Sequence, residues 1–237
     1  MTRQAEIVAV DTAPLVERYA AEALEFKPRP VDSVLRAIDV VLAGSALVAT
    51  APLLAICAVA VRMSGRPVLY RGARVGRFGA TFTMYKFRTL RLGADQRLGR
   101  RLGGELTRLT SAELTRLTES ELTSTGVHLR RSKLDELPQL WNVLVGDMSL
   151  VGPRPIRPAF FEELCREIPA YWQRLVVRPG ITGFAQLRLT REMTWTEKLA
   201  HDFEWIADRS VGLYFSILAE TAWTLLTRPP RGPVGRI

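Results

Sequence analysis

The most prominent feature of the hydrophobic pattern is an apolar run from Val40 to Val61, which contains no charged residue. About twenty apolar residues in a helix are enough to cross the hydrocarbon core of a bilayer. The run begins well inside the chain, so it is not a cleaved signal peptide. The pattern therefore predicts a membrane helix over residues 34–64, with a fully buried core helix as the alternative.

Basic residues flank the apolar run on both sides, between residues 27 and 36 and between residues 62 and 77. Positively charged loops stay on the cytoplasmic side, so a straight span cannot satisfy both ends. Pro52 removes a backbone donor and bends a helix. This favours a re-entrant segment, in which a helix, a break and a second helix return to the same face. Asp39 is costly in lipid unless it is paired, and Arg36 is its predicted partner.

Shorter patterns follow the apolar run. Residues 67–70 and 81–85 read as strands around a glycine turn, which predicts a β-hairpin. Residues 158–177 are a helix candidate broken at Pro169. Residues 211–227 form a mainly apolar helix, suited either to the membrane interface or to docking on the core.

These elements predict a membrane-associated α/β fold that is mostly helical, with amphipathic interfacial helices around a cytosolic core. The expected order is a leader helix with a linker over residues 1–33, the membrane segment, a cytosolic domain over residues 65–227 and a basic tail over residues 228–237. Residues 91–125 are polar and repetitive, which is typical of a variable surface insertion.

The net charge of +9 predicts an anionic partner. Nucleic acid, phospholipid head groups and a phosphorylated substrate all fit this charge. A nucleic-acid binder has no use for the long apolar run. The two cysteines, Cys57 and Cys165, are predicted to be free thiols, and two histidines supply neither a zinc centre nor a histidine-based triad well.

Two adjacent carboxylates, Asp135 and Glu136, lie among cations that include Arg130. The simple structural explanation is a helix start, in which Ser132 and Asp135 form a capping box. Leucines and a tryptophan recur at helical spacing and commit one face to the core; they are Leu134, Leu137, Leu140, Trp141 and Leu144. The carboxylates fall away from that face, and the helix start and cations are expected to keep Asp135 ionised.

Several uncommon motifs occur in a fixed order along the chain. They are Arg36 and Asp39 before the run with Pro52, YKFRT at 85–89, LDELPQL at 134–140, GDMSLVGPRP at 146–155 and RPGITG at 178–183. With these motifs the chain resembles the bacterial sugar transferases, monotopic phosphoglycosyl transferases that load a sugar phosphate onto a polyprenyl phosphate carrier. The resemblance covers most of residues 34–227.

The resemblance implies a two-step reaction in the domain over residues 65–227. Asp135 attacks the β-phosphate of a UDP-sugar and releases UMP, and polyprenyl phosphate then takes the phosphosugar from the carboxylate. The family uses Mg²⁺, which Asp135 helps to coordinate, and Glu136 is assigned to proton handling or metal support. The cations expected to bind the substrate phosphates are Lys86, Arg88, Arg130 and Arg154.

The implied location is the bacterial inner (cytoplasmic) membrane, with the catalytic domain on the cytoplasmic face, at the first membrane step of glycan assembly. The implied partners are a UDP-sugar, polyprenyl phosphate and membrane lipids, with no nucleic acid; a homo-oligomer is left open. The alternative function is a non-catalytic membrane-surface binding protein, which binds liposomes without releasing UMP.

The chain departs from the family pattern after Gln186, where Leu187, Arg188 and Leu189 replace an Asn-Gly-Arg run. This departure leaves the sugar unassigned. Tyr214 stands where the family usually has aspartate. The chain also lacks the multi-span N-terminal region of longer relatives, so a minimal catalytic form is expected.

Overall fold

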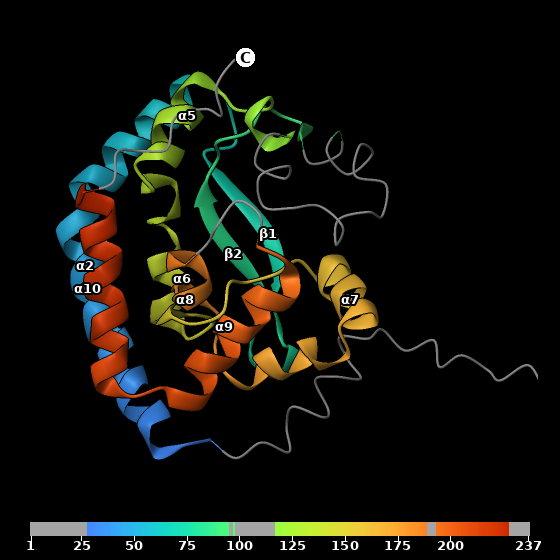
Figure 1. The fold of residues 1–237 in the computed structure, drawn as a ribbon. Helices are drawn as coiled ribbons and strands as arrows, with labels where there is room; N and C mark the ends of the chain where they lie inside the picture. Colours follow the sequence, from blue (N-terminus) through green and yellow to red (C-terminus); the bar gives the residue numbers. More distant parts are fainter. Residues whose placement is uncertain (1–27, 95–96, 98–116, 189–192, 228–237) are drawn as a thin grey trace, which may run out of the picture.

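A computed structural model describes residues 28–94, 97, 117–188 and 193–227 (Figure 1). Within this part, the chain is mostly helical, as predicted, and it has two small two-stranded sheets, of which only the β-hairpin was predicted. The predicted leader helix, most of the insertion and the basic tail lie outside the described residues. The two described ends of the insertion meet, because Leu90 and Leu122 form an antiparallel bridge.

The apolar run lies in α2, a single helix over Pro30–Met63 that follows one side of the molecule (Figure 1). Only 11% of its most apolar 18-residue window is buried inside the molecule, which disfavours a buried core helix. The helix passes Pro52 without ending, so the expected break between two helices is not found. Thr50 lies two residues before it and donates its hydroxyl to the Ala46 carbonyl at 2.7 Å. Whether α2 returns to the same membrane face stays a prediction.

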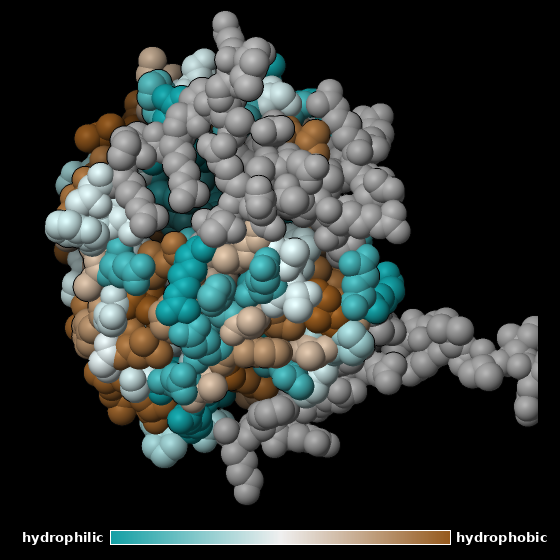
Figure 2. Space-filling model, in the orientation of Figure 1, coloured by the Kyte–Doolittle hydropathy of each residue, from teal (hydrophilic) through white to brown (hydrophobic). Residues whose placement is uncertain are grey.

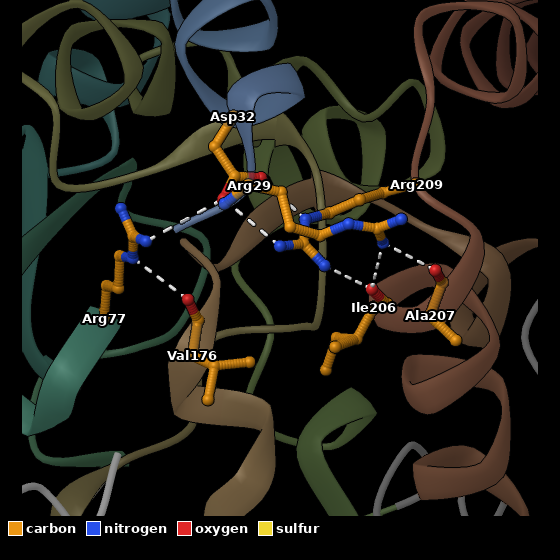
Figure 3. Close-up of polar contacts among 7 residues, drawn as sticks. All are labelled: Arg29, Asp32, Arg77, Val176, Ile206, Ala207 and Arg209. Atoms are coloured by element: carbon orange, nitrogen blue, oxygen red, sulfur yellow. Dashed lines mark hydrogen bonds and ion pairs between the residues drawn. The ribbon is translucent and has the colours of Figure 1, made fainter. Parts of the chain in front are cut away.

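Four charged residues form a polar clasp at the start of α2: Arg29, Asp32, Arg77 and Arg209 (Figure 3). Asp32 accepts a 2.6 Å bond from Arg209, which directly follows α9 (Trp195–Asp208). Arg29 donates to the Ala207 carbonyl at 2.6 Å, at the negative end of α9. The clasp therefore ties the first turn of the apolar helix to the last turn of α9.

The predicted β-hairpin is confirmed. Strand β1 (Leu69–Val75) pairs antiparallel with β2 (Thr81–Phe87), and the register joins Leu69 to Phe87 and Val75 to Thr81. The turn contains the short helix η1 (Arg77–Gly79). Met84 and Lys86 are two residues apart and therefore lie on the same face of β2, where Met84 is buried in the core and Lys86 lines the cleft described below.

A second sheet joins two of the motifs. Strand β3 (Ser149–Val151) pairs in parallel with β4 (Gly180–Thr182). A Cβ on Gly180 would lie 2.1 Å from the backbone nitrogen of Gly152, so these two backbones can approach only because glycine has no side chain. The close approach holds the turn that carries Arg154 against the loop before β4.

The remaining helices surround the two sheets. The predicted break at Pro169 is confirmed, since α7 (Pro158–Glu167) is followed by η3 (Pro169–Val176). The predicted last helix is also confirmed as α10 (Val211–Thr227), which runs beside α2 (Figure 1). Helix α9 was not predicted, although Thr194 and Glu197 form the capping box that marks its start.

One large hydrophobic core fills the space between α7, η3, α9 and α10, with Phe161, Tyr171 and Tyr214 fully buried. A smaller core lies between α2, β2 and α6 (Gln139–Val145). Both predicted free thiols, Cys57 and Cys165, are free and buried. These cores fix the elements that carry the charged side chains of the site.

Candidate active site

The two carboxylates lie in a short turn rather than in a long helix. Helix α5 (Ser124–Arg131) ends just before Lys133, which adopts a left-handed conformation with φ 59°. The 3₁₀ turn η2 (Leu134–Glu136) follows and leads into α6. The predicted continuous helix is therefore wrong, because the chain changes from 3₁₀ to α geometry around Pro138.

Two further details of the sequence interpretation are also wrong. Ser132 donates its hydroxyl to the carbonyls of His128 and Leu129, so it closes α5 and forms no capping box with Asp135. Trp141 is 52% exposed and does not belong to the core face. Both errors follow from treating this segment as one regular helix.

Asn142 connects α6 to the hairpin. Its side-chain oxygen accepts a 3.0 Å bond from the backbone nitrogen of Tyr85, and its nitrogen donates to the Thr83 carbonyl at 2.8 Å. It also donates to Asp147 at 3.1 Å, and it is fully buried. These bonds fix α6, and the carboxylate turn that precedes it, beside the strand that carries Lys86.

Glu136 is the centre of an ion-pair cluster. Lys86 Nζ lies 2.6 Å from Glu136 Oε1, and Arg154 Nη2 lies 3.7 Å from the same oxygen. Burial opposes its charge, but the attraction of Lys86, Arg154 and Lys133 prevails and lowers the pKa of Glu136 to about 2. Glu136 is therefore ionised throughout the neutral range.

Asp135 has a different environment from its neighbour. It is 6% exposed, and its Oδ1 has no hydrogen-bond partner. Burial and the negative charge of Glu136 raise its pKa, against the attraction of Lys86, Lys133 and Arg130. The expectation that a helix start would lower its proton affinity is wrong, because a three-residue turn supplies little dipole and burial prevails.

The predicted phosphate ligands fall into two groups. Lys86, Arg130 and Arg154 gather around the carboxylates and line the same cleft. Arg88 also reaches the cleft wall, but it donates to the backbone carbonyls of Ser64, Pro67 and Leu90. In this structure its guanidinium ties the end of β2 to the end of α2, and its phosphate role stays a prediction.

The predicted membrane residues Arg36 and Asp39 do not bond to each other. Arg36 donates to the carbonyls of Val143 and Leu144 at 2.5 and 2.8 Å, at the end of α6. Asp39 accepts bonds from the Leu150 backbone, Ser149 and Tyr214 at 2.7 to 3.0 Å. The predicted pairing of Arg36 with Asp39 is wrong, because each side chain reaches a different element of the core.

A cleft of about 1640 Å³ opens beside Asp135 and Glu136. Among the described residues that line it, eleven are lysine or arginine and three are aspartate or glutamate. Lys86, Arg130, Lys133 and Arg154 act electrostatically on the two carboxylates, and Leu140, Ile181 and Leu218 line the same cleft. The cleft thus combines a site for anionic groups with a site for hydrocarbon.

Comparison with known proteins agrees with this arrangement. The sequence profile described as bacterial sugar transferase matches residues 31–228. The chain belongs to the bacterial sugar transferase family. This match covers the cleft, α10, nearly all of α2 and every residue of the polar clasp except Arg29.

Similar members of the bacterial sugar transferase family have named activities. An Aeromonas hydrophila UDP-N-acetylgalactosamine-undecaprenyl-phosphate N-acetylgalactosaminephosphotransferase is 35% identical over 84% of this chain and 45% of its own length. UDP-glucose:undecaprenyl-phosphate glucose-1-phosphate transferases from Caulobacter vibrioides and Escherichia coli K12 are 37% and 36% identical, over 83% and 79% of this chain. The chain spans 71% of the Caulobacter protein and 39% of the Escherichia coli protein.

Sequence reasoning missed a buried ion pair in this sugar transferase. Arg174 and Asp202 are 2.7 Å apart, and both are more than nine-tenths buried. Arg174 also donates to the Tyr171 hydroxyl at 2.7 Å and to the Arg154 carbonyl at 2.9 Å. It therefore holds the backbone of the turn that presents Arg154 to Glu136. Asp202 lies 28 residues along the chain from Arg174, and no local pattern marks the pair.

Lys198 is a second residue that the sequence did not indicate. It lines the cleft, with its Nζ 3.7 Å from the centre of the Trp195 ring. Burial, aided by the positive charge of Arg154, lowers the pKa of Lys198 to about 8. It adds a cation that titrates near physiological pH to the wall of the cleft.

The donor set near Asp135 fits a magnesium ion that is also bound by substrate phosphates. Among the described residues, no group of three or more histidine, cysteine, aspartate or glutamate side chains could hold a metal by itself. Mg²⁺ is usually held by one or two carboxylates, waters and substrate phosphates rather than by a complete protein cage. The carboxylate of Asp135, whose Oδ1 is buried without a partner, could offer one such ligand.

Proposed function

We propose that this sugar transferase moves a sugar 1-phosphate from a UDP-sugar to polyprenyl phosphate and releases UMP. The observation that carries the proposal is a buried carboxylate with an unpartnered oxygen, Asp135, in a cleft whose charged lining residues are mostly cations. The named activities of the similar family members support the choice of UDP-sugar and polyprenyl phosphate. We place the reaction at the cytoplasmic face of the bacterial inner membrane, at the start of glycan assembly.

In the first step, Oδ1 of Asp135 attacks the β-phosphorus of the UDP-sugar. A bond forms between Oδ1 and phosphorus, and the bond from that phosphorus to the bridging oxygen breaks. UMP leaves with the electron pair, so an aspartyl phosphosugar remains on the protein. Asp135 must attack as the carboxylate, and Arg130, Lys133 and Lys86 favour that form.

In the second step, a phosphate oxygen of polyprenyl phosphate attacks the phosphorus held by Asp135. The new diphosphate bond forms as the bond to Oδ1 breaks, and the carboxylate is regenerated. Charge on the reacting phosphates is offset by fixed cations, of which Lys86 and Arg154 are oriented by Glu136. With a pKa of about 2, Glu136 is a poor proton acceptor, so we assign it to this orientation.

The role proposed for Mg²⁺ is to neutralise the diphosphate of the bound UDP-sugar. Asp135 is the residue that would hold it, together with oxygens of the substrate phosphates. Arg130 and Arg154 offer planar guanidinium groups that match phosphate oxygens on the remaining sides.

The experiment that tests this function is UMP release by purified protein in lipid nanodiscs, over a panel of UDP-sugars with polyprenyl phosphate and Mg²⁺. We expect Asp135→Asn to abolish release while it remains in the membrane fraction. Asp208→Asn makes the same change on the exposed end of α9 and should leave release unaltered. Liposome binding without UMP release by the wild type would favour the non-catalytic membrane-surface binding protein.

A further inference from the structure

Helix α10 presents apolar side chains both to the outside of the molecule and to the cleft. Phe215, Trp223 and Leu226, which are 47%, 68% and 84% exposed, do not line the cleft. Leu218 and Leu225 do line the cleft, and the side chain of Leu225 is 53% exposed there. These two leucines are seven residues apart, so they lie on one face of the helix. A soluble docking helix would bury one of these sides and keep the other polar.

The position of α10 beside α2 is fixed by polar contacts. The polar clasp ties the start of α2 to Arg209, just before α10 begins (Figure 3). Two turns further along α2, Asp39 accepts a 2.7 Å bond from the hydroxyl of Tyr214. In the middle of α10, the hydroxyls of Thr221 and Thr182 are 2.8 Å apart. The two apolar helices therefore form one unit with the cleft wall.

Both α2 and α10 carry exposed apolar side chains. Val48 and Ile56 of α2 are 78% and 66% exposed. Figure 2 shows hydrophobic side chains gathered along the edge that α2 and α10 occupy in Figure 1. An apolar surface of this kind suits the interior of a lipid layer. Helix α10 thus separates a lipid-facing surface from the cleft.

Apolar side chains from other elements line the same cleft. Leu137, Leu140 and Leu150 line it, together with Ile181 of β4. Leu137 is two residues from Asp135, so the apolar lining reaches the charged part of the site. An acceptor with a phosphate head group and a hydrocarbon tail fits a cleft in which charged and apolar lining residues lie next to one another.

We propose that the cleft face of α10 is the track for the hydrocarbon tail of an isoprenoid phosphate. The tail enters from the lipid beside α10 and contacts Leu218 and Leu225, while its phosphate reaches the cations around Asp135. This inference rests on the proposed function and deepens it, because it names the residues that select the acceptor. The UDP-sugar then occupies the part of the cleft next to the hairpin.

The test compares two leucines that differ in the side of α10 on which they lie. Leu225→Gln and Leu226→Gln make the same substitution in adjacent positions, and glutamine preserves helix propensity. Loss of the contact between the tail and one leucine side chain is expected to raise KM for polyprenyl phosphate about tenfold in Leu225→Gln. Leu218→Gln should have the same effect, whereas Leu226→Gln should leave KM for polyprenyl phosphate unchanged.

A second measurement separates binding of the acceptor tail from the first chemical step. Exchange of labelled UMP into UDP-sugar, without any acceptor, reports the first step alone, and it should be equal in all three variants and the wild type. A KM for polyprenyl phosphate that is unchanged in both Leu218→Gln and Leu225→Gln would overturn the track. A wild type that exchanges no UMP but transfers phosphosugar would contradict the covalent step and leave the KM comparison valid.

Binding is tested without turnover by a polyprenyl phosphate that carries a photoreactive diazirine in its tail. We expect labelling of the peptide that contains Leu218 and Leu225, and we expect unlabelled polyprenyl phosphate to compete. Labelling that ordinary phospholipid removes equally well, or that falls only on the outer face around Trp223, would contradict the proposal.

Discussion

The ion pair between Lys86 and Glu136 gives the most quantitative prediction. We expect Lys86→Met to destabilise the protein at pH 7, because it leaves a carboxylate of which only 14% is exposed without its nearest cation. The pKa of Glu136 falls from 4.5 to about 2 in the folded protein. A difference of about 2.5, at about 1.4 kcal/mol for each pKa unit, corresponds to about 3 kcal/mol. Lys86 is the largest of the lowering causes and shares this figure with Arg154 and Lys133, so about 3 kcal/mol is the upper limit for Lys86→Met.

The direction of the pH dependence follows from the same pKa. Glu136 binds protons less readily in the folded state, so its contribution is complete above pH 4.5 and is lost as the pH falls toward 2. The deficit of Lys86→Met should therefore shrink below pH 4.5. Burial lowers the pKa of Lys86 and offsets part of the gain, so the double variant Lys86→Met/Glu136→Gln should recover most of the lost stability.

The assay is urea unfolding in detergent micelles, followed by tryptophan fluorescence at pH 7 and pH 3.5. Lys133→Met is the matched control, because Lys133 is an exposed cation of the same cleft and should cost about 0.5 kcal/mol or less. A deficit for Lys86→Met equal to that of Lys133→Met would refute the reasoning. So would a deficit that does not change with pH.

Three further predictions follow from the site. Asp135→Asn should raise the free energy of unfolding by about 1 kcal/mol at pH 8, because it removes a buried carboxylate whose pKa is raised; urea unfolding should show the gain disappear at pH 3. Arg174→Met should cost about 3 to 5 kcal/mol, since Asp202 is left buried and unpaired, and a normal melting temperature would contradict this. KM for UDP-sugar should rise above pH 8 as Lys198 loses its charge, and Lys198→Arg should remove that rise; identical pH profiles would oppose a role for Lys198.

The helices and the hairpin could be predicted where the pattern is local. The apolar runs in α2 and α10 and the alternation in β1 and β2 identify these elements without any knowledge of their neighbours. The same holds for the proline between α7 and η3. The segment with the carboxylates could not be predicted correctly, because leucine spacing does not distinguish one helix from a 3₁₀ turn followed by a helix.

The chemistry of the site depends on contacts that no local pattern contains. The motifs identify Asp135 and Glu136, but only the fold places Lys86 against one carboxylate and leaves the other without a partner. The opposite pKa changes of these adjacent residues follow from that difference. The partners of Asp39 likewise come from β3 and α10, not from the neighbouring turn that sequence spacing favoured.

The central claim is that Asp135 carries the phosphosugar between two substrates. The most direct measurement is mass spectrometry of the intact protein and its peptides after incubation with UDP-sugar and Mg²⁺ in the absence of polyprenyl phosphate. We predict one added sugar phosphate on the peptide that contains Asp135, its loss when polyprenyl phosphate is supplied, and no adduct in Asp135→Asn. Transfer by the wild type without any adduct, together with undiminished transfer by Asp135→Asn, would contradict the claim.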